Sequence, residues 1–575
     1  MFKFKLSYVA LAAALTSPGV FAGISAYTHS SGTTVVNIEA PNAAGVSHNI
    51  YKDFSVDNKG VILNNSSSDF NHSTLGGIEK NSNLSGRSAS VILNEVTSNI
   101  PSSLKGFIEV GGQKADVIIA NPNGITCSGC SFINTNKAIM TTGTVSLTES
   151  GAIGSYNVKR GIITIDKEGM DASNSYAVLL GDSINLNGVI NAQHAQLSAG
   201  NFTLDNATGA ITSAGKAANE IQLLHPSYSI DISNLGGIKA NSISMVGNNL
   251  GFGVRNKGAI VANSGLSMSS NGVLINNGTI SANGFVTQMV SAGNMTNTGK
   301  ISTKNTAMIT SYGGLSNSGT IENNNQMAIS AAGDISNSGA IDASRMLIVK
   351  TNGNLTTNYA SLLKSDNLAI TALGNINNGG TTYGYNTNVM FGGDSFNVTG
   401  NISGIDNLVI QAAKDNAYTS GAISNSGSLS GRNITLVTNG AVKQLTGAHT
   451  KTANSLTIKS GTLDNAGYMG GGYRDDFYTA INIENQTTKN SGQIVGDNVS
   501  FKTRNDMLNE GMIFAFKDLN IDTQKNGKFI NRSSVYAKTL NLSVKEVVND
   551  GYKCGFLNRS TCGVGKITAD KTVQK

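Results

Sequence analysis

The stretch Asn317-Ser318-Gly319-Thr320-Ile321 returns twenty residues later as Asn337-Ser338-Gly339-Ala340-Ile341. The same Gly-x-Ile pattern occurs eight times between positions 188 and 341, and from Gly236 onward the glycines are 20 to 22 residues apart. Self-similarity at a fixed period marks a repeat architecture, in which each repeat packs on its neighbours. The fold must therefore be built from stacked units of about 20 residues.

A second pattern follows the same period, because short apolar runs begin at Met308, Met327, Leu347 and Leu368. Short β-forming runs separated by Gly and Asn turns predict an all-β protein, a right-handed parallel β-helix with about three strands per coil. Apolar side chains would stack inside, and Asn and Gly would form the corners. The asparagines two residues before the glycines could form a ladder along the axis: Asn256, Asn276, Asn297, Asn317 and Asn337.

The repeat becomes irregular after about residue 350, although glycines still follow Asn-rich turns, as at Gly427 and Gly492. Tyr383-Gly384-Tyr385 and residues 470–476 are predicted to be loops that leave the coil.

Composition agrees with a core of small β-formers. Hydrophobic residues make up 39% of the 575 residues, aromatic residues 6% and charged residues only 13%. Few aromatics and no clear amphipathic helices disfavour an α/β enzyme. The net charge of +6 is dispersed along the chain, whereas nucleic-acid binding requires a clustered basic surface. No nucleic-acid partner is therefore predicted.

The N-terminus has the layout of a secretory signal peptide. Lys3 and Lys5 precede an apolar run over residues 6–15, and Val20-Phe21-Ala22 ends the segment with a small residue. The run is too short to cross a bilayer, which needs about 20 residues. Residues 1–22 are therefore predicted to be a signal peptide that is cleaved after Ala22, so that the mature chain is exported.

The four cysteines form two local pairs, Cys127 with Cys130 and Cys554 with Cys562. A shared zinc site would have to bring together residues more than 400 positions apart. A thioredoxin-like redox motif would need a βαβ unit, and none is visible. In an oxidising compartment two local disulfides are the simplest prediction.

Residues 23–250 contain ordered motifs that carry a family resemblance. They include Ala40-Pro41-Asn42, Gly45-Val46-Ser47-His48-Asn49, Gly106-Phe107-Ile108-Glu109-Val110, Asn121-Pro122-Asn123-Gly124-Ile125 and Cys127-Ser128-Gly129-Cys130. Together they resemble the two-partner secretion domain of the filamentous haemagglutinin family, whose exoproteins leave Gram-negative cells through a dedicated outer-membrane β-barrel transporter. The Cys-x-x-Cys motif is similar to that of the subgroup containing secreted haemolysins and contact-dependent growth inhibition exoproteins.

The resemblance implies a domain plan and a partner. Residues 23–250 would be the secretion domain, which caps the β-helix at its N-terminal end, and residues 251–575 would be a β-helical shaft. The five-residue motif at 121–125 would be needed either for recognition by the partner transporter or for nucleating the β-helix, and both possibilities stay open. The product would pass through the periplasm and be secreted or displayed on the outer cell surface.

No catalytic constellation stands out in the sequence. The six histidines are scattered without metal-ligand spacing, and no nucleophile elbow or phosphate-binding loop occurs. His48 is expected to be a structural residue. The chain is therefore predicted not to be an enzyme and to need neither a metal nor a cofactor.

The leading functional hypothesis is an adhesin or haemagglutinin-like rod that binds a receptor on a host or neighbouring cell. The alternative is the N-terminal portion of a haemolysin or contact-dependent toxin-delivery protein, since such proteins are much longer. A β-helical polysaccharide lyase would need clustered Asp, Arg or Lys on one face, where the repeats carry Asn, Ser and Thr. The identity of the receptor and whether the chain is complete are open at this point.

Overall fold

A computed structural model describes residues 24–212, 228–471, 478–550 and 565–574, together with the backbone of two short strands, β59 (Tyr552–Cys554) and β60 (Ser560–Gly563). Within these residues the regular structure consists of strands and one 3-10 turn, η1 (Ser82–Leu84). The chain divides into two compact units, residues 1–193 with 200–213, and residues 194–199 with 214–575. The predicted all-β class is confirmed.

In the first unit, one sheet contains β1 (Ser25–Thr28), β2 (Thr34–Asn37), β3 (Val46–Tyr51), β4 (Val61–Asn65), β7 (Val91–Val96), β9 (Phe107–Gly112), β10 (Ala115–Ala120), β12 (Cys130–Ile133), β13 (Thr135–Thr141) and β17 (Met170–Gly181). A second sheet contains β8 (Ser102–Leu104), β11 (Ile125–Cys127), β16 (Ile162–Ile165) and β18 (Ser183–Leu186). Outside these sheets lie β5 (Phe70–His72), β6 (Gly76–Ile78), β14 (Thr144–Leu147), β15 (Ile153–Val158) and β20 (Phe202–Asp205). The division between the units falls within β19 (Val189–Ala199).

In the second unit, the longer sheet contains β22 (Gly237–Gly247), β24 (Ala259–Ser270), β26 (Thr279–Ala282), β27 (Val286–Ser291), β29 (Lys300–Thr303), β30 (Thr306–Ser311), β32 (Thr320–Asn323), β33 (Gln326–Ala331), β35 (Ala340–Ala343), β36 (Met346–Thr351), β38 (Leu362–Ala372), β40 (Thr381–Phe391), β42 (Asn401–Lys414), β45 (Ser428–Val437), β47 (His449–Lys459), β49 (Tyr468–Gly470), β50 (Ala480–Asn485), β52 (Gln493–Gly496), β53 (Asn498–Thr503), β55 (Met512–Asp522), β57 (Ser534–Ser543) and β61 (Lys566–Gln574). The second sheet contains β21 (Tyr228–Ile232), β23 (Gly253–Asn256), β25 (Leu274–Asn276), β28 (Met295–Asn297), β31 (Leu315–Asn317), β34 (Ile335–Asn337), β37 (Leu355–Thr357), β39 (Ile376–Asn378), β41 (Ser395–Val398), β44 (Ala422–Asn425), β46 (Ala441–Gln444), β48 (Thr462–Asn465), β51 (Thr487–Asn490), β54 (Met507–Asn509), β56 (Lys528–Asn531) and β58 (Glu546–Asn549). A short strand, β43 (Ala417–Tyr418), pairs back on β42.

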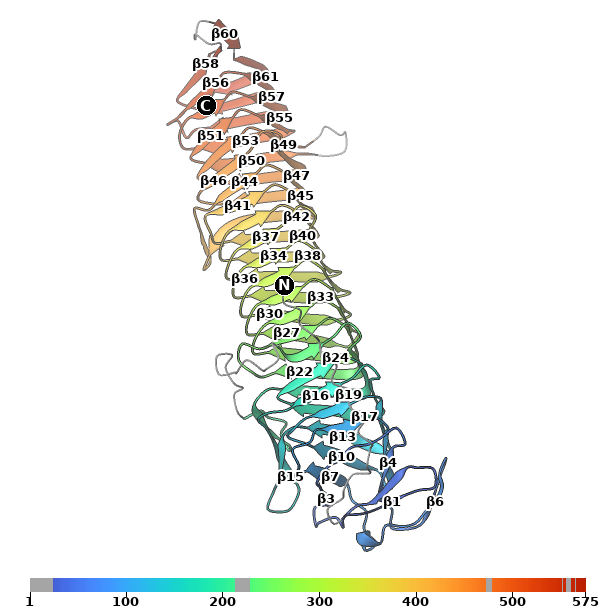
Figure 1. Cartoon of the computed structure of the whole chain (residues 1–575). Helices are drawn as coiled ribbons and strands as arrows, with labels where there is room; N and C mark the ends of the chain where they lie inside the picture. Colours follow the sequence, from blue (N-terminus) through green and yellow to red (C-terminus); the bar gives the residue numbers. More distant parts are fainter. Residues whose placement is uncertain are drawn as a thin grey trace, which may run out of the picture. The chain divides into compact units, whose positions relative to one another are not determined.

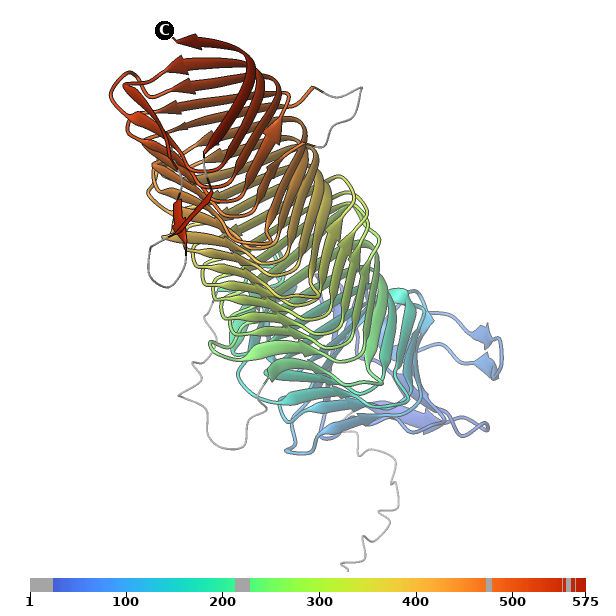
Figure 2. The ribbon, with the colours of Figure 1, turned by 90° about the horizontal axis from the view of Figure 1, so that it is seen from above.

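One coil of the second unit consists of three short strands in succession, as in β31, β32 and β33. Each strand pairs in parallel with the corresponding strand of the next coil, β34, β35 and β36. Figure 1 and Figure 2 show these strands stacked in parallel rows through the second unit. The predicted parallel β-helix with about three strands per coil is therefore confirmed.

The Gly-x-Ile pattern marks the start of the second strand of a coil. Ile321 and Ile341 are buried and lie opposite each other across the β32–β35 pair, while Thr320 and Ala340 before them are partly exposed. The glycine sits where successive corners touch, since a Cβ on Gly339 would lie 2.0 Å from the carbonyl oxygen of Gly319. Buried isoleucines each contribute about 1.5–3 kcal/mol relative to exposed ones. The period thus fixes both the apolar stack and the glycine corner.

The asparagines before these glycines form the predicted ladder inside the coil. Each side-chain amide donates through Nδ2 to Oδ1 of the asparagine in the next coil, at 2.8 Å from Asn256 to Asn276, 2.7 Å from Asn276 to Asn297, 2.7 Å from Asn297 to Asn317 and 2.8 Å from Asn317 to Asn337. All five residues are almost fully buried. The ladder satisfies amides that would otherwise be buried without partners.

The coils continue beyond residue 350, where the sequence repeat becomes irregular. Thr357, Val398 and Gln444 occupy the ladder position in individual coils. An amide-to-amide bond joins Asn425 to Gln444 at 3.0 Å, and the bonds between asparagines resume from Asn465 to Asn490 at 2.7 Å. Extra residues are accommodated outside the coil, for example in the turn that leads to β43. The irregular spacing therefore reflects extra residues at corners and register shifts within strand pairs such as β40–β42 and β42–β45, while the parallel pairing continues from coil to coil.

One predicted loop is wrong. Tyr383-Gly384-Tyr385 lies within β40, with Gly384 buried and both tyrosines pointing outward. A Cβ at Gly384 would lie 2.8 Å from the carbonyl oxygen of Ser365, so this glycine marks a close approach inside a strand. Of the predicted loop at 470–476, residues 472–476 lie outside the described residues.

The first unit has the same parallel coils but adds layers that the repeat does not predict. The strand β1 pairs antiparallel with β2, at the start of the described chain. The antiparallel sheet β14–β15–β20 covers the strands β3, β7, β10, β13 and β17 through a shared apolar cluster that includes Tyr156 and Phe202. The hairpin β5–β6 covers a second cluster around Ile62.

The predicted signal peptide, residues 1–22, lies outside the described residues. Among the residues that are described, no helix has the length and apolar character needed to span a membrane.

We expect Asn317→Ala to lower the free energy of unfolding by about 1–3 kcal/mol, because it leaves the buried amide of Asn297 without its acceptor and that of Asn337 without its donor. Chemical denaturation followed by circular dichroism measures this change. Asn324→Ala is the matched control, because Asn324 belongs to the same coil but its side chain is exposed. Equal denaturation midpoints for the two variants would contradict a stabilising ladder.

Candidate functional site

The motif Asn121-Pro122-Asn123-Gly124-Ile125 forms the corner between β10 and β11. The Gly124 backbone N–H donates to the carbonyl oxygen of Asn121 at 3.1 Å, which closes a tight turn. Gly124 has a φ of +114°, a conformation that side chains rarely adopt. Asn-Pro and Asn-Gly favour such turns. The local sequence thus specifies the corner.

The Asn121 side chain is completely buried and binds to the preceding coil. Its Nδ2 donates to the carbonyl oxygen of Ile100 at 2.9 Å and to Oγ of Ser102 at 3.0 Å. Its Oδ1 accepts the backbone N–H of Asn123 at 3.0 Å. Its own backbone N–H donates to the carbonyl oxygen of Thr141 in the following coil at 2.9 Å. Asn121 therefore ties three successive coils together.

The rest of the motif is partly exposed but also packs on both neighbouring coils. Nδ2 of Asn123 donates to the carbonyl oxygen of Ser98 at 2.7 Å. The following coil approaches so closely that a Cβ on Gly161 would lie 2.8 Å from the carbonyl oxygen of Pro122. Pro122 and Asn123 keep partial exposure, whereas Gly124 and Ile125 are buried. The corner thus offers the solvent only a small polar surface.

The structure places the cystine directly after this corner. Cys127 ends β11 and Cys130 begins β12, both are buried, and their Sγ atoms are 2.00 Å apart in a disulfide. The site residues predicted between positions 121 and 130 therefore lie together on one coil. Cys554 and Cys562 belong to β59 and β60, which pair antiparallel, but their side chains lie outside the described part of the chain.

The motif itself contains no titratable group, and the charged groups around it belong to structural contacts. Burial raises the pKa of the Asp116 carboxyl at the start of β10, although Lys137 opposes this shift. Burial, with a smaller contribution from Asp116, also raises the pKa of the Tyr156 hydroxyl. This arrangement does not resemble an acid–base pair open to a substrate.

Two histidines of the first unit bind carboxylates on other strands. Nε2 of His48 lies 2.8 Å from Glu95, and Nε2 of His72 lies 2.8 Å from Glu109. Nδ1 of His72 accepts the backbone N–H groups of Thr74 and Leu75, so this ring positions the β5–β6 hairpin. Within the described ranges, no group of three His, Cys, Asp or Glu side chains could hold a metal ion.

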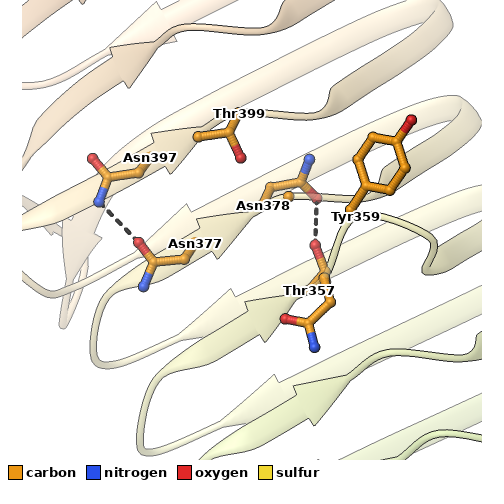
Figure 3. A pocket seen from close by; sticks show the side chains of 8 residues that line it. Thr357, Tyr359, Asn377, Asn378, Asn397 and Thr399 are labelled. Atoms are coloured by element: carbon orange, nitrogen blue, oxygen red, sulfur yellow. Dashed lines mark hydrogen bonds between the residues drawn. The ribbon is translucent and has the colours of Figure 1, made fainter.

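The second unit contains a surface pocket that the sequence analysis did not predict. It has a volume of about 430 Å³ and lies beside Tyr359, with Asn377 and Asn397 on its wall (Figure 3). The available signal was the spacing, because four residues separate Thr357 from Leu362, whereas two separate Asn337 from Ala340 in the paired coil. A two-residue insertion in a regular corner could have revealed it.

We expect Asn121→Ala to lower the free energy of unfolding of the first unit by about 1–3 kcal/mol, because buried groups on the preceding coil lose their donor. Urea denaturation with a circular dichroism readout measures the change. Asn58→Ala serves as the control, since Asn58 is exposed in the same unit. If Asn121→Ala unfolds at the same urea concentration as the control, the buried contacts do not stabilise the corner.

Comparison with known proteins gives a match over the N-terminal part of the chain, including residues 214–277 of the second unit. The family model described as the TPS secretion domain matches residues 20–277. A protein of Yersinia pestis named toxin CdiA is 41% identical over 254 residues, a segment that covers 44% of this chain and 8% of that protein. A protein of Enterobacter cloacae subsp. cloacae named 16S rRNA endonuclease CdiA is 38% identical over 270 residues, covering 46% of this chain and 8% of that protein.

Among solved structures, the filamentous hemagglutinin secretion domain aligns with a TM-score of 0.42 and 30% identity, covering 52% of this chain and 93% of that domain. The chain thus matches less than a tenth of the length of the two curated relatives. Exoproteins of two-partner secretion systems are secreted or displayed at the outer surface of Gram-negative bacteria. Residues 20–277 match the TPS secretion domain, and the chain is similar to two-partner-secreted exoproteins such as those named CdiA.

Proposed function

We propose that the chain is exported through a cognate outer-membrane β-barrel transporter and acts as a haemagglutinin-type adhesin on a host or neighbouring cell. The match of residues 20–277 to the TPS secretion domain carries the export part of this proposal. The coils of the second unit supply extended polar surfaces, which suit contact with another cell surface. No catalytic role is assigned to the described chain.

The stacked coils suit export of an unfolded chain. Each strand of the second unit pairs with the strands of the preceding and following coils, as Ile321 does with Ile301 and Ile341. A coil can therefore fold as soon as it has emerged, on the template of the coil before it. Folding outside the cell in this order would draw the chain outward without another energy source.

Within this scheme, we assign the corner at Asn121 to nucleation of the β-helix. Its buried amide is bonded to Ile100 and Ser102 and its backbone to Thr141, so its contacts are used within the fold. Direct contact with the transporter would rest on Pro122 and Asn123, which keep partial exposure. The two roles can be separated experimentally.

The second candidate function is toxin delivery, in which this chain would be the N-terminal portion of a longer protein. The relatives named toxin CdiA and 16S rRNA endonuclease CdiA favour it, since they match this chain over only 8% of their own length. The Cys127–Cys130 pair agrees with the subgroup that contains such exoproteins. In that case, the toxic activity would belong to a separate region.

We expect Asn121→Ala to reduce the amount of chain outside cells that also produce the cognate transporter, in step with the loss of stability of the purified variant. Immunoblots of the culture medium and of the surface fraction measure export. Pro122→Ala and the exposed Asn58→Ala are compared in parallel. Export that fails while urea stability is unchanged, in Asn121→Ala or Pro122→Ala, would contradict nucleation and support direct recognition.

We expect bacteria that display the chain to attach to target cells, and attachment to fall to background when the gene is deleted. Counts of bound bacteria on cell monolayers and on neighbouring bacteria measure this, with transporter-only cells as the control. Unchanged attachment after deletion would overturn the adhesin proposal. Lysis of red cells or growth arrest of neighbours by this chain would instead favour the toxin-delivery alternative.

A further inference from the structure

The pocket beside Tyr359 lies at a corner of the second unit that is two residues longer than the paired corner of the preceding coil. In the coil before it, two residues connect the ladder position to the next strand, from Asn337 to Ala340. From Thr357 to Leu362 the connection has four residues, so Tyr359 and Ala360 are additional. In solenoids such insertions map to loops on one face, which is often the binding face.

The insertion is held in one conformation by its own hydrogen bonds. The backbone N–H of Ser361 donates to the carbonyl oxygen of Asn358 at 2.9 Å, and its Oγ donates to the same oxygen at 2.7 Å. These bonds close the bulge and leave the Tyr359 side chain 93% exposed. A large aromatic ring that contacts so little of its own chain contributes little to the stability of the fold.

The corner of the next coil opens space beside this ring. It is formed by Gly379 and Gly380, which have no side chains to fill the hollow, and a Cβ on Gly379 would lie 2.8 Å from the carbonyl oxygen of Thr357. Figure 3 shows the Tyr359 ring on one side of Asn378 and the amides of Asn377 and Asn397 on the other. The resulting pocket has a volume of about 430 Å³, within the range of small-ligand sites.

The wall of the pocket presents amides in a fixed order. Nδ2 of Asn397 donates to Oδ1 of Asn377 at 2.8 Å, which orients both groups. In the described part of the chain, Nδ2 of Asn377 and Oδ1 of Asn397 have no hydrogen-bond partner, so one donor and one acceptor are available. The Thr399 hydroxyl on the rim is exposed and can act as either.

The chemistry of this wall selects a class of ligand. All eight lining residues are uncharged, which disfavours an anionic group or a nucleotide phosphate. The pocket combines one apolar aromatic face with groups that both donate and accept hydrogen bonds. A sugar ring has the same combination, with an apolar C–H face and hydroxyls that donate and accept.

We propose that Tyr359, Asn377, Asn397 and Thr399 form a binding site for a neutral saccharide. The sugar stacks its C–H face on the Tyr359 ring and exchanges hydrogen bonds with the two amides and the hydroxyl. This site deepens the proposed adhesin function by naming the ligand class, and it rests on that function only for its biological setting.

The test measures binding of the purified chain to a glycan array. The array carries neutral glycans that end in galactose, glucose, mannose, fucose or N-acetylhexosamine, and it also carries sialylated and sulfated glycans. We expect neutral glycans to be retained, with at least a tenfold weaker apparent affinity for Tyr359→Ala and a several-fold weaker one for Asn377→Ala. Tyr312→Ala is the matched control, because Tyr312 is 68% exposed in the same unit and does not line the pocket. It should bind as the unchanged chain does.

A variant that lacks Tyr359 and Ala360 restores the two-residue corner of the preceding coil, so it should keep the thermal unfolding curve and lose neutral-glycan binding. Retention of no glycan, retention of anionic glycans alone, or binding that is equal in Tyr359→Ala and the unchanged chain would overturn the site. Cell attachment is scored separately with the same variants. Attachment that persists in Tyr359→Ala while glycan binding is lost would leave the adhesin proposal standing and remove this pocket from it.

Discussion

The structure depends on one interaction, the hydrogen bonding of buried asparagine side chains in one coil to the coils on either side. The asparagine ladder from Asn256 to Asn337 provides it with one side-chain amide per coil, at distances of 2.7–2.8 Å. Asn121 provides it in the first unit through Ile100 and Ser102. Because an unpaired buried amide costs about 1–3 kcal/mol, a coil without a neighbour is unstable.

This interaction explains why so much of the second unit could be predicted from the sequence. A twenty-residue period places Ile321 on Ile341 and Asn317 on Asn337, so strand pairing, core and ladder all follow from local spacing. Where the spacing changes, one predicted loop is wrong and one inserted loop was not predicted. The predicted loop at Tyr383-Gly384-Tyr385 is wrong, because these residues belong to β40, whereas Tyr359 belongs to an insertion that a comparison of coil lengths reveals.

The additional layers of the first unit could not be predicted in this way, because their contacts join distant positions. Asn42 donates to the carbonyl oxygen of Gly151 at 2.8 Å across 109 residues, and β20 completes an antiparallel sheet with β14 and β15. The candidate site could be predicted from the sequence only in part. Its turn at Asn121 and its cystine follow from short motifs, but the burial of Asn121 between coils became evident only in the structure. A secretion domain with such non-local contacts can provide the folded end on which later coils are built.

We propose that the coils fold in order, beginning with the secretion domain. The most direct test is pulsed hydrogen exchange during refolding of the purified chain, with protection measured by mass spectrometry of its peptides. If the corner at Asn121 nucleates the β-helix, backbone protection appears first in peptides covering residues 91–141. It then spreads through successive coils of the second unit toward its later strands. Protection that arises in all coils at once, or first in the coils beyond residue 465, would contradict ordered folding from the secretion domain.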